Sequence, residues 1–599
     1  MGAIAIFLAE RGDAGPEVVR TMVAAAPHRG ACVETLVHMR AALAISHADD
    51  TPDAALGLVN GVAVAVVGAI ANADDLARDI DAWLSARNEA PLPDGDLPAL
   101  LAVGHRAFGA DLPARLRGVF AVAVSDGQRA YCFRDHVGYR PLFYRRDERG
   151  FYAATEAKQV VAGAGIPREP DLEVLDHIFF RTATDDTPAA LRGVRRLPKA
   201  TGVTADATGT HLRRYWHPES LLETGSLAAD ELQARFDELM DQAVSRCLTG
   251  SDVVSLSGGI DSPAVAAFAA PRHQERYGRP LQAMSVIYPR HPSVDESRYV
   301  MLLAERFGMP LHTYEQSANP LADMARWAAL ADTPFPGAAL AHYEEDFLRA
   351  RALGFRTILT GEHAEFVFAF QWNTLDHFLT HGRLGAARRE LSERRARGQS
   401  WISLARLVGR SVAHDRVMRA RNAIGRGRPA TVPTWIDLRR AIDEEPIAAG
   451  ERWRRSQLVG FIGPGVALEA EEVCQAVVGV SSRRPWTDID LWELFLSLPA
   501  EQKFPDLRPK GLVRDLLRGR VPDEVLDRTD KTVFDEAMLS EIDYPTLRRF
   551  LTRPDERLPG VDYARLDTLL QSEQLGPLDY QWARNLAGVH AFLSQWGSA

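Results

Sequence analysis

The run Ser-Gly-Gly-Ile-Asp-Ser that begins at Ser257 combines residue types that could bind phosphate. Gly258 and Gly259 carry no side chain that would keep an anion away from the backbone N–H groups of a turn. Ser257 and Ser262 add hydroxyl donors. Asp261 alone would repel phosphate, so its presence predicts a bridging Mg²⁺ ion. An ordinary glycine turn is the alternative interpretation, and the match of the whole run to the pattern SGGxDS disfavours it.

The residues on either side predict the elements that hold this run. Apolar residues from Val253 precede it and an alanine-rich segment up to Ala270 follows it, which indicates a strand, a tight loop and a helix. A helix in this place points its positive N-terminal end at the loop. The motif resembles the pyrophosphate-binding (PP) loop of the N-type ATP pyrophosphatases. The resemblance implies ATP and Mg²⁺ as ligands, cleavage of ATP to AMP and pyrophosphate, and activation of a carboxylate as its acyl-adenylate.

Strand and helix patterns alternate from Leu281 to Thr360, which predicts a parallel sheet with ligands at the carboxyl ends of its strands. At the last of these ends, Gly-Glu-His-Ala-Glu resembles the Gly-Glu-Gly-Ala-Asp of asparagine synthetases. Two acids beside a nucleotide loop suit metal and proton chemistry. By this resemblance Glu362 is the candidate base for the attacking amine. Glu365, one methylene longer than the family's Asp, is the candidate second Mg²⁺ ligand beside Asp261.

Two lysines further along the chain complete the predicted site. Lys510 and Lys531 match the two lysines by which asparagine synthetases hold pyrophosphate and the anionic intermediates. Fixed cations are needed there because negative charge builds on the leaving phosphates and on the tetrahedral carbon. Asp295, Glu296 and Tyr299 match an acidic-aromatic signature of the family, for which a capped helix start and a place in the ATP pocket both stay open.

Composition excludes several other classes of function. The 599 residues exceed one ordinary core, and a prior of about 150 residues per domain suggests two to four domains. A net charge of -10 argues against nucleic-acid binding. The four cysteines are widely spaced without a CxxC pair, which excludes a recognisable zinc site and fits a reducing compartment. Because neither a signal peptide nor a run of about 18 apolar residues occurs, we expect a soluble, cytoplasmic protein that engages no membrane.

The first domain, predicted over residues 1–215, consists of short β-type runs with amphipathic helices near Glu17 to Ala26 and Leu97 to Phe108, a pattern that favours two sheets covered by helices. The β-type runs are Ala3 to Ala9, Val62 to Ala71, Val119 to Ser125, Ala130 to Asp135, Pro141 to Arg146 and Phe151 to Thr155. Landmarks in the right order resemble the N-terminal nucleophile (Ntn) glutaminase domain of asparagine synthetases, which has an αββα fold. They are His28-Arg29-Gly30, Arg117 to Ala123, Arg134 to Tyr144, Phe151 to Lys158 and Leu191 to Pro198.

This domain departs from the family where glutamine would be hydrolysed. The resemblance implies a cysteine nucleophile directly after the initiator Met, whereas the sequence has Gly2 and then Ala3. The family's Asn-Gly-Glu, whose Asn helps to hold the oxyanion, reads Val67-Gly68-Ala69, and its Pro-Asp after His-Arg-Gly reads Ala31-Cys32. We therefore expect an inactive glutaminase that serves as a scaffold, with glutamine excluded as the amine source.

The second domain, predicted over residues 216–599, is the α/β PP-loop domain with a helical C-terminal part. An Arg-rich helical insertion lies near residues 380–430, where thirteen arginines between Arg383 and Arg428 stand against three acidic residues. A solvated helical face is the ordinary interpretation. A docking surface for a charged peptide or a partner protein is the alternative, and the added length suggests a larger active-site vestibule.

From end to end the chain resembles B-type asparagine synthetases with a degenerate glutaminase half and an intact adenylating half. Lasso peptide cyclases and the β-lactam or carbapenam synthetases share this state, and in both groups an amine of the substrate itself attacks the activated carboxylate. We favour a lasso peptide cyclase, a macrolactam synthetase acting on a leader-free precursor core peptide. A leader peptidase and a leader-binding recognition protein are the implied partners. An ammonia-dependent asparagine synthetase-like enzyme and a non-catalytic nucleotide-binding protein are further alternatives.

Overall fold

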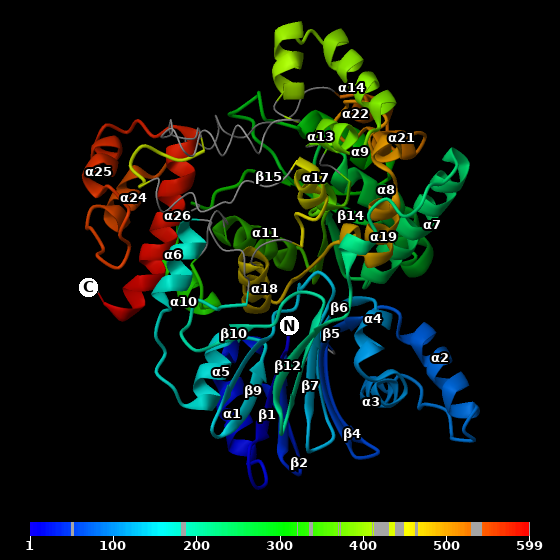
Figure 1. Ribbon diagram of the computed structural model, residues 1–599, viewed down its shortest axis with the longest axis vertical. Helices are drawn as coiled ribbons and strands as arrows, with labels where there is room; N and C mark the ends of the chain where they lie inside the picture. The colour runs from blue at the N-terminus through cyan, green and yellow to red at the C-terminus, as the bar shows by residue number, and fades with distance from the viewer. Residues whose placement is uncertain are drawn as a thin grey trace.

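The computed structural model describes residues 1–48, 53–180, 187–319, 321–334, 340–368, 371, 373–409, 411, 431–437, 449–461, 465–528, 539 and 542–597. Figure 1 shows two antiparallel sheets in the lower part of the molecule and a parallel sheet with most of the helices above them. The predicted α/β class is confirmed. Within the described ranges, no helix combines the length and the apolar character that crossing a bilayer requires.

The first two sheets have six strands each and pack face to face, in the orders β10-β8-β9-β1-β3-β2 and β12-β11-β7-β6-β5-β4. Alternation along β1 (Ala3–Ala9) explains the packing, because Ile4, Ile6 and Leu8 lie in the core between the sheets whereas Phe7 lies in the core on the outer side. The other strands are β2 (Cys32–His38), β3 (Ala41–His47), β4 (Ala54–Val59), β5 (Val62–Ile70), β6 (Gly118–Ser125), β7 (Ala130–Arg134), β8 (Phe143–Asp147), β9 (Gly150–Ala154), β10 (Arg195–Arg196), β11 (Thr201–Asp206) and β12 (Gly209–Arg214).

Helices cover the outer face of each sheet, which completes the predicted four layers. On the first sheet lie α1 (Pro16–Ala24) and α5 (Ala157–Ala164), and on the second lie α2 (Ala73–Ser85) and α3 (Leu97–Phe108). All six predicted strands and both predicted helices of this half are present, each end shifted by at most two residues. β2, β3, β4, β10, β11 and β12 were not predicted.

The third sheet is parallel, with five strands in the order β15-β14-β13-β16-β17. Because parallel strands end at one edge, the loop after β13 (Asp252–Ser255) and the loop after β16 (Thr357–Leu359) are neighbours. The predicted alternation of strands and helices is confirmed. The remaining elements are β14 (Gln282–Val286), β15 (Leu311–Tyr314), β17 (Ser481–Arg483), α7 (Ala229–Cys247), α8 (Asp261–Tyr277), α9 (Ser297–Arg306) and α11 (Leu340–Ala352).

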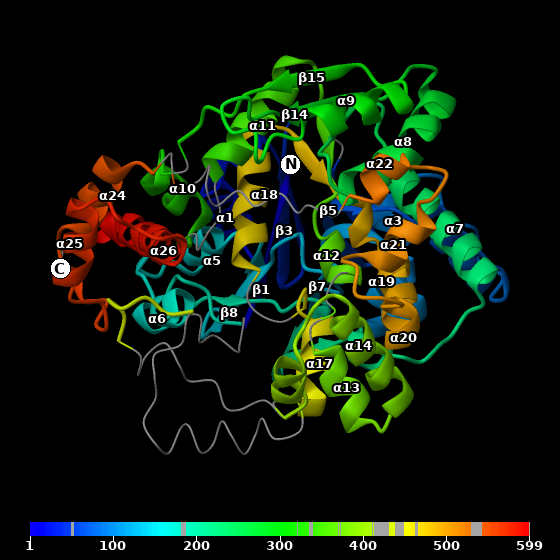
Figure 2. The same cartoon turned by 90° about the horizontal axis from the view of Figure 1, so that it is seen from above.

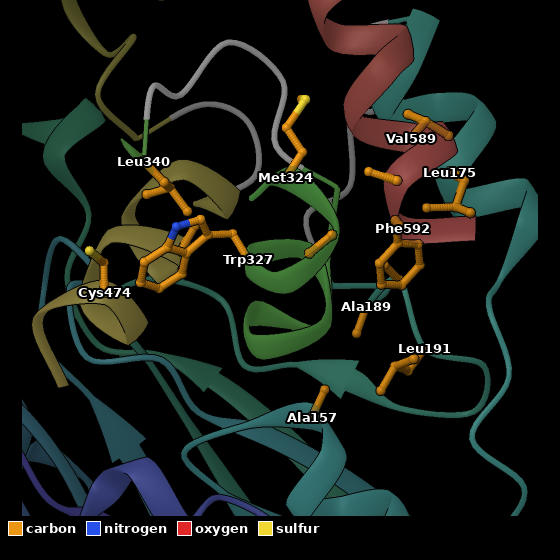
Figure 3. Packing of buried hydrophobic residues seen from close by; sticks show 14 of the residues in the cluster. Ala157, Leu175, Ala189, Leu191, Met324, Trp327, Leu340, Cys474, Val589 and Phe592 are labelled. Atoms are coloured by element: carbon orange, nitrogen blue, oxygen red, sulfur yellow. The ribbon is translucent and has the colours of Figure 1, made fainter. Parts of the chain in front are cut away.

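One apolar core joins the C-terminal helices to both halves. Figure 3 shows Trp327 of α10 (Met324–Ala331) between Leu340 of α11 and Cys474 of α18, with Phe592 of α26 on the far side of α10. Trp327 is only 1% exposed. Figure 2 shows α26 beside α6 of the first half, so the last helices seal the molecule against the first domain. The bounds are α6 (Leu172–Phe180), α18 (Val466–Val478), α24 (Tyr544–Leu551), α25 (Tyr563–Gln571) and α26 (Pro577–Leu593).

Helix α18 also connects the two halves through buried charge pairs. Arg29 of the first half donates Nη1 to Oε1 of Glu472 at 2.7 Å, and Arg140 donates to the same oxygen. About one turn earlier on α18, Glu469 accepts from Nη2 of Arg196 at 3.0 Å. All five side chains are buried. Removing one member of such a group leaves charges buried without their partner, which costs far more than an exposed pair contributes.

We expect Glu472→Gln to destabilise the chain by about 3–5 kcal/mol, because two buried guanidinium groups lose their shared carboxylate. Burial raises the pKa of Glu472, but the charges of Arg29 and Arg140 together lower it by more, so the pKa lies below its ordinary value of 4.5. Its contribution is therefore complete above pH 4.5 and is lost as the pH falls through the folded-state pKa.

Calorimetric unfolding of the full chain between pH 3 and 8 would measure both effects. The matched control is Glu17→Gln, which breaks an ion pair whose glutamate is 77% exposed and should cost less than about 1 kcal/mol. Equal Tm changes in the two variants would contradict a stabilising role for the charge cluster on α18.

Candidate active site

The predicted phosphate-binding run forms the loop between β13 and the N-terminus of α8, as its flanks indicate. The N–H of Ser257 donates to Oγ of Ser262 at 2.9 Å, and the two hydroxyls lie 3.0 Å apart, so the serines close the loop on itself. A Cβ built on Gly259 would meet nothing nearer than Oγ of Ser257 at 3.5 Å, so this residue has an open side. Backbone donors at the start of a 17-residue helix are the arrangement that binds phosphate.

Gly361 brings the end of β16 against the start of α8. A Cβ at this position would lie 2.3 Å from the backbone N of Ser262 and 2.5 Å from the carbonyl carbon of Asp261. No side chain fits in that space unless one of the two backbones moves. Glycine here therefore sets the spacing between the phosphate-binding loop and Glu362, the next residue along.

Gly361→Ala is expected to destabilise the chain by about 1–3 kcal/mol and to lower ATP-dependent activity, because the added methyl group pushes α8 away from β16. Gly259→Ala is the matched control, since the same methyl group has room there. Thermal unfolding of both variants tests the prediction. If Gly361→Ala unfolds at the same temperature as wild type and as Gly259→Ala, the close approach of the two backbones does not limit stability.

Lys510 reaches the phosphate-binding loop from far along the chain. Its Nζ donates to Oδ1 of Asp261 at 2.6 Å and also contacts Oδ2. The two side chains are 24% and 25% exposed, so a ligand can reach the pair. Lys510 precedes α21 (Gly511–Leu516) and has a φ of 59°. The structure thus brings together two residues predicted separately as phosphate clamp and metal ligand. Lys531 lies outside the described residues and stays a prediction.

Glu365, in the first turn of α12 (Ala364–Phe368), is the second predicted metal ligand. Burial, together with the negative charge of Asp261, raises the pKa of Glu365 above its ordinary value. Hard oxygen donors of this kind suit Mg²⁺. In the part of the chain that the structure describes, no group of three or more His, Cys, Asp or Glu side chains could hold a metal ion. Asp261 and Glu365 are the residues that would hold Mg²⁺ in this part of the chain.

Glu362, the predicted base, accepts two hydrogen bonds that the sequence did not reveal. Tyr343 of α11 donates its hydroxyl to Oε1 at 3.0 Å, and Arg484 donates Nε to Oε2 at 2.9 Å. The Glu362 side chain is 35% exposed whereas that of Arg484 is 4% exposed. The carboxylate is therefore open to a substrate while Arg484 is fixed in the interior. Arg484 belongs to an Arg-Arg-Pro-Trp motif, and Tyr343 has no sequence signal of this kind.

Arg484 also binds a second carboxylate. Glu471 of α18 is buried and accepts from Nη2 of Arg484. Burial and the charge of Glu362 raise the pKa of Glu471 above its ordinary value, in opposition to the charge of Arg484. When Glu471 is protonated, Glu362 is the only one of the two carboxylates whose negative charge offsets the positive charge of Arg484. The network thus extends from the exposed carboxylate to the helix that joins the two halves.

Glu296 and Arg528 form a further pair at the phosphate-binding loop. Oε2 of Glu296 accepts from the N–H of Gly258 at 2.9 Å, and Oε1 accepts from Nη1 of Arg528 at 2.7 Å. The Arg528 guanidinium carbon lies 4.5 Å from the centre of the Tyr299 ring. Asp295 instead bonds the first residue of α9 through its carboxylate. Of the acidic-aromatic signature, Asp295 therefore holds the turn before α9, whose N-cap residue Glu296 makes no side-chain cap, whereas Glu296 and Tyr299 lie at the loop.

The position expected to hold a glutaminase nucleophile has no room for a side chain. A Cβ built on Gly2, the residue before β1, would lie 2.5 Å from the carbonyl oxygen of Ser46. The N–H of Gly2 faces the carboxylate of Asp53, with both oxygens at 3.3 Å. A cysteine could stand here only if β3 moved away from the residue.

A cavity of about 890 Å³ lies between the two halves. Its wall includes Met1, Asp53 and Arg140 of the first half and Glu472 and Arg484 of the second. The cavity therefore borders the Glu362 network through Arg484 and borders the charge cluster on α18 through Glu472.

The described part of the Arg-rich insertion lies beside the candidate site. Arg394 of α14 (Leu384–Ala396) pairs with Glu390, one turn earlier. Arg397, the residue after α14, pairs with Glu393 in the same way. Arg397 also donates to the carbonyl oxygen of Leu507, three residues before Lys510, at 3.0 Å. Trp401 is 70% exposed, with the guanidinium carbon of Arg395 5.6 Å from its ring. Most of the remaining insertion lies outside the described residues.

Comparison with known proteins gives a family match for each half. The sequence model of the family Asparagine synthase matches residues 235–597, and that of the Glutamine amidotransferase domain matches residues 1–216. Asparagine synthetase [glutamine-hydrolyzing] 3 of Bacillus subtilis is 27% identical over 484 residues, which cover 77% of this chain and 73% of that protein. Carboxyethyl-arginine beta-lactam-synthase of Streptomyces clavuligerus is 32% identical over 210 residues, which cover 34% of this chain and 36% of that protein. A solved structure of glutamine phosphoribosylpyrophosphate amidotransferase from B. subtilis aligns with a TM-score of 0.27 and 12% identity, over 60% of this chain and 81% of that one.

Proposed function

The chain belongs to the asparagine synthase family of ATP-dependent amide-forming ligases, and from this premise we propose that it is a lasso peptide cyclase. Its substrate is a leader-free core peptide. The chain activates an Asp or Glu side-chain carboxylate of the peptide with ATP and closes a macrolactam on the peptide's own N-terminal amine. A leader peptidase and a leader-binding protein supply the core peptide.

The observation that carries this proposal is the contrast between the two halves. Gly2 has no room for a nucleophile, so the first half cannot release ammonia from glutamine by that route. The second half has a phosphate-binding loop, Lys510 on Asp261, and Glu362 open to a substrate. An intact activating site without an ammonia source favours an amine that the substrate itself carries.

The reaction proceeds in two steps on these residues. A carboxylate oxygen of the peptide attacks the α-phosphorus of ATP, and pyrophosphate leaves toward the open side of the loop at Gly259, the N-terminus of α8 and Lys510. Mg²⁺ held by Asp261 and Glu365 would offset the charge of the phosphates. The N-terminal amine then attacks the acyl carbon, Glu362 accepts a proton from that amine, and AMP leaves. Intramolecular attack gains from the high effective concentration of the amine.

Two observations bear on the size of the substrate. Arg397, which bonds to Leu507 shortly before Lys510, and the exposed Trp401 on the same insertion support a substrate larger than an amino acid. The similarity to carboxyethyl-arginine beta-lactam-synthase supports a second candidate, a small-molecule cyclase that also forms an intramolecular amide. An ammonia-dependent synthetase of the asparagine type is a third candidate.

The test is intact-mass analysis of the purified full chain with ATP, Mg²⁺ and synthetic peptides that carry a free N-terminal amine and a single Asp or Glu at successive positions. AMP and pyrophosphate are measured in parallel. We expect one peptide of the series to become lighter by one water, in step with AMP release. Acetylating the N-terminus of that peptide should abolish the product but not the activation of its carboxylate.

Other outcomes select other functions. AMP release driven by aspartate with ammonia, or by a small β-amino acid, would replace the peptide cyclase with a small-molecule synthetase. Release of glutamate from glutamine would contradict the scaffold role of the first half. If none of these substrates supports ATP–pyrophosphate exchange, the chain is better explained as a non-catalytic nucleotide-binding protein.

A further inference from the structure

A loop of the first half reaches into the candidate site. Asp135 is buried and its carboxylate accepts from the backbone N–H groups of Tyr139 at 3.0 Å and Arg140 at 2.9 Å, which fixes the shape of the loop. From this loop the buried ring of Tyr139 contacts the second half. It lies edge-on to the ring of His363 at 5.4 Å, and the guanidinium carbon of Arg484 lies 5.1 Å from its centre.

These two contacts fall on either side of Glu362. His363 is the next residue in the chain, and Arg484 is the hydrogen-bond donor to Oε2 of Glu362. A shift of either neighbour would move the carboxylate. Tyr139 thus contacts both neighbours that hold the proposed base in place.

The backbone at His363 has to be held in place. Its φ is 68°, the left-handed region that a residue with a side chain occupies at a cost in energy. The His363 ring is packed between Tyr139 and the ring of Phe366, 5.1 Å away. Aromatic packing of this kind can select a strained backbone conformation over its relaxed alternatives.

We propose that Tyr139 is a positioning residue for amide-bond formation, which holds His363 and Arg484 so that Glu362 faces the attacking amine. The proposal rests on the proposed function of Glu362 as base. It gives the glutaminase-like half a direct part in the reaction of the other half: its loop forms one wall of the synthetase site.

The ring of Tyr139, not its hydroxyl, makes these contacts. Among the described residues the Tyr139 hydroxyl is buried without a hydrogen-bond partner. Tyr139→Phe therefore keeps every contact named above and serves as the matched control for Tyr139→Ala. His363→Gly removes the same contact from the other side, and glycine tolerates the left-handed backbone better than histidine does.

The first experiment needs no substrate. Hydrogen exchange of the full chain is followed at the amides of Thr360 and Phe366, which bond to the carbonyls of Arg483 and His363 at 3.0 Å each. Tyr139→Ala should accelerate exchange about tenfold, as expected from the loss of one aromatic and one cation–π contact. Tyr139→Phe should stay within about twofold of wild type. Unchanged exchange in Tyr139→Ala would overturn the proposal.

The second experiment separates the two steps of the reaction, using the peptide that loses one water in the mass test. Tyr139→Ala and His363→Gly should each slow product formation at least about tenfold and leave ATP–pyrophosphate exchange within about twofold. Because both variants remove one contact, the double variant should be no slower than the worse single one. If, in contrast, both variants lose product formation and ATP–pyrophosphate exchange to the same extent and also show a lowered Tm, Tyr139 has only a structural role.

Failure of the proposed function has a different signature. If no peptide is activated but the hydrogen-exchange result holds, the cyclase is wrong and the contact between the halves stands. If wild type forms the macrolactam and Tyr139→Ala forms it equally fast, the cyclase stands and the positioning role is wrong.

Discussion

Replacing Lys510 with alanine is expected to lower the rate of ATP–pyrophosphate exchange by about 10²–10³-fold, the loss typical when one fixed group that stabilises developing charge is removed. Lys510 lies 2.6 Å from Asp261 at the mouth of the phosphate-binding loop, partly exposed to solvent. Without its ammonium group, the carboxylate of Asp261 and the leaving pyrophosphate repel each other. The defect should appear in the activation step, before any amine takes part.

Lys510→Arg is the informative companion variant. It keeps the positive charge but replaces a compact ammonium with a planar guanidinium that does not fit the same contact. We expect a rate between those of wild type and Lys510→Ala. Thermal unfolding of both variants should stay close to wild type, because the ion pair is about a quarter exposed. Exchange at the wild-type rate in Lys510→Ala would remove Lys510 from the site.

Several strands, β1 among them, could be predicted from the sequence, whereas β2 and β3 could not. In β1, buried apolar residues alternate between two cores, so the pattern is visible in any window. β2 (Cys32–His38) lies at a sheet edge, and its side chains are exposed or only half-buried, so no apolar run marks it. β3 forms a strand because it pairs with β1, with Ala3 opposite Ser46 and Leu8 opposite Ala41. No local pattern encodes this pairing.

The same distinction applies to the candidate site. The phosphate-binding loop and the base are contiguous motifs, and their relation follows from the rule that parallel strands end at one edge. The groups that hold Glu362 come from α11 and from the residue after β17, so their contact exists only in three dimensions. Lys510 was predicted as a phosphate clamp, but its pairing with Asp261 depends on the docking of α21 beside the loop.

The role of the first half was the least predictable feature. Gly2 indicates only that a nucleophile is missing, and the steric reason appears when β3 is seen behind it. Buried arginines that meet Glu472 and Glu469 could not be paired from sequence, because any of the chain's many acidic residues could have been their partner. Those pairs and Tyr139 tie the two halves together at the synthetase site.

Glu362→Gln is expected to slow macrolactam formation by about 10²–10⁴-fold, because an amide cannot take the proton of the attacking amine. The substitution should preserve the geometry. Nε of Arg484 can only donate, so the glutamine oxygen faces Arg484, and its NH₂ group faces the hydroxyl of Tyr343, which can accept. The loss should therefore fall on amide formation, while ATP–pyrophosphate exchange stays within about threefold of wild type.

Glu365→Gln provides the contrast that makes this split decisive. Glu365 lies one turn along the same segment and is the proposed second Mg²⁺ ligand beside Asp261. Its substitution should lower exchange and product formation together, since both need the activated carboxylate. Single-turnover measurements on the two variants, with peptidyl-adenylate and macrolactam followed by mass, distinguish the two carboxylates. If Glu362→Gln instead lost exchange and product in parallel, Glu362 would belong to carboxylate activation, and the proton of the amine would have to leave by another group.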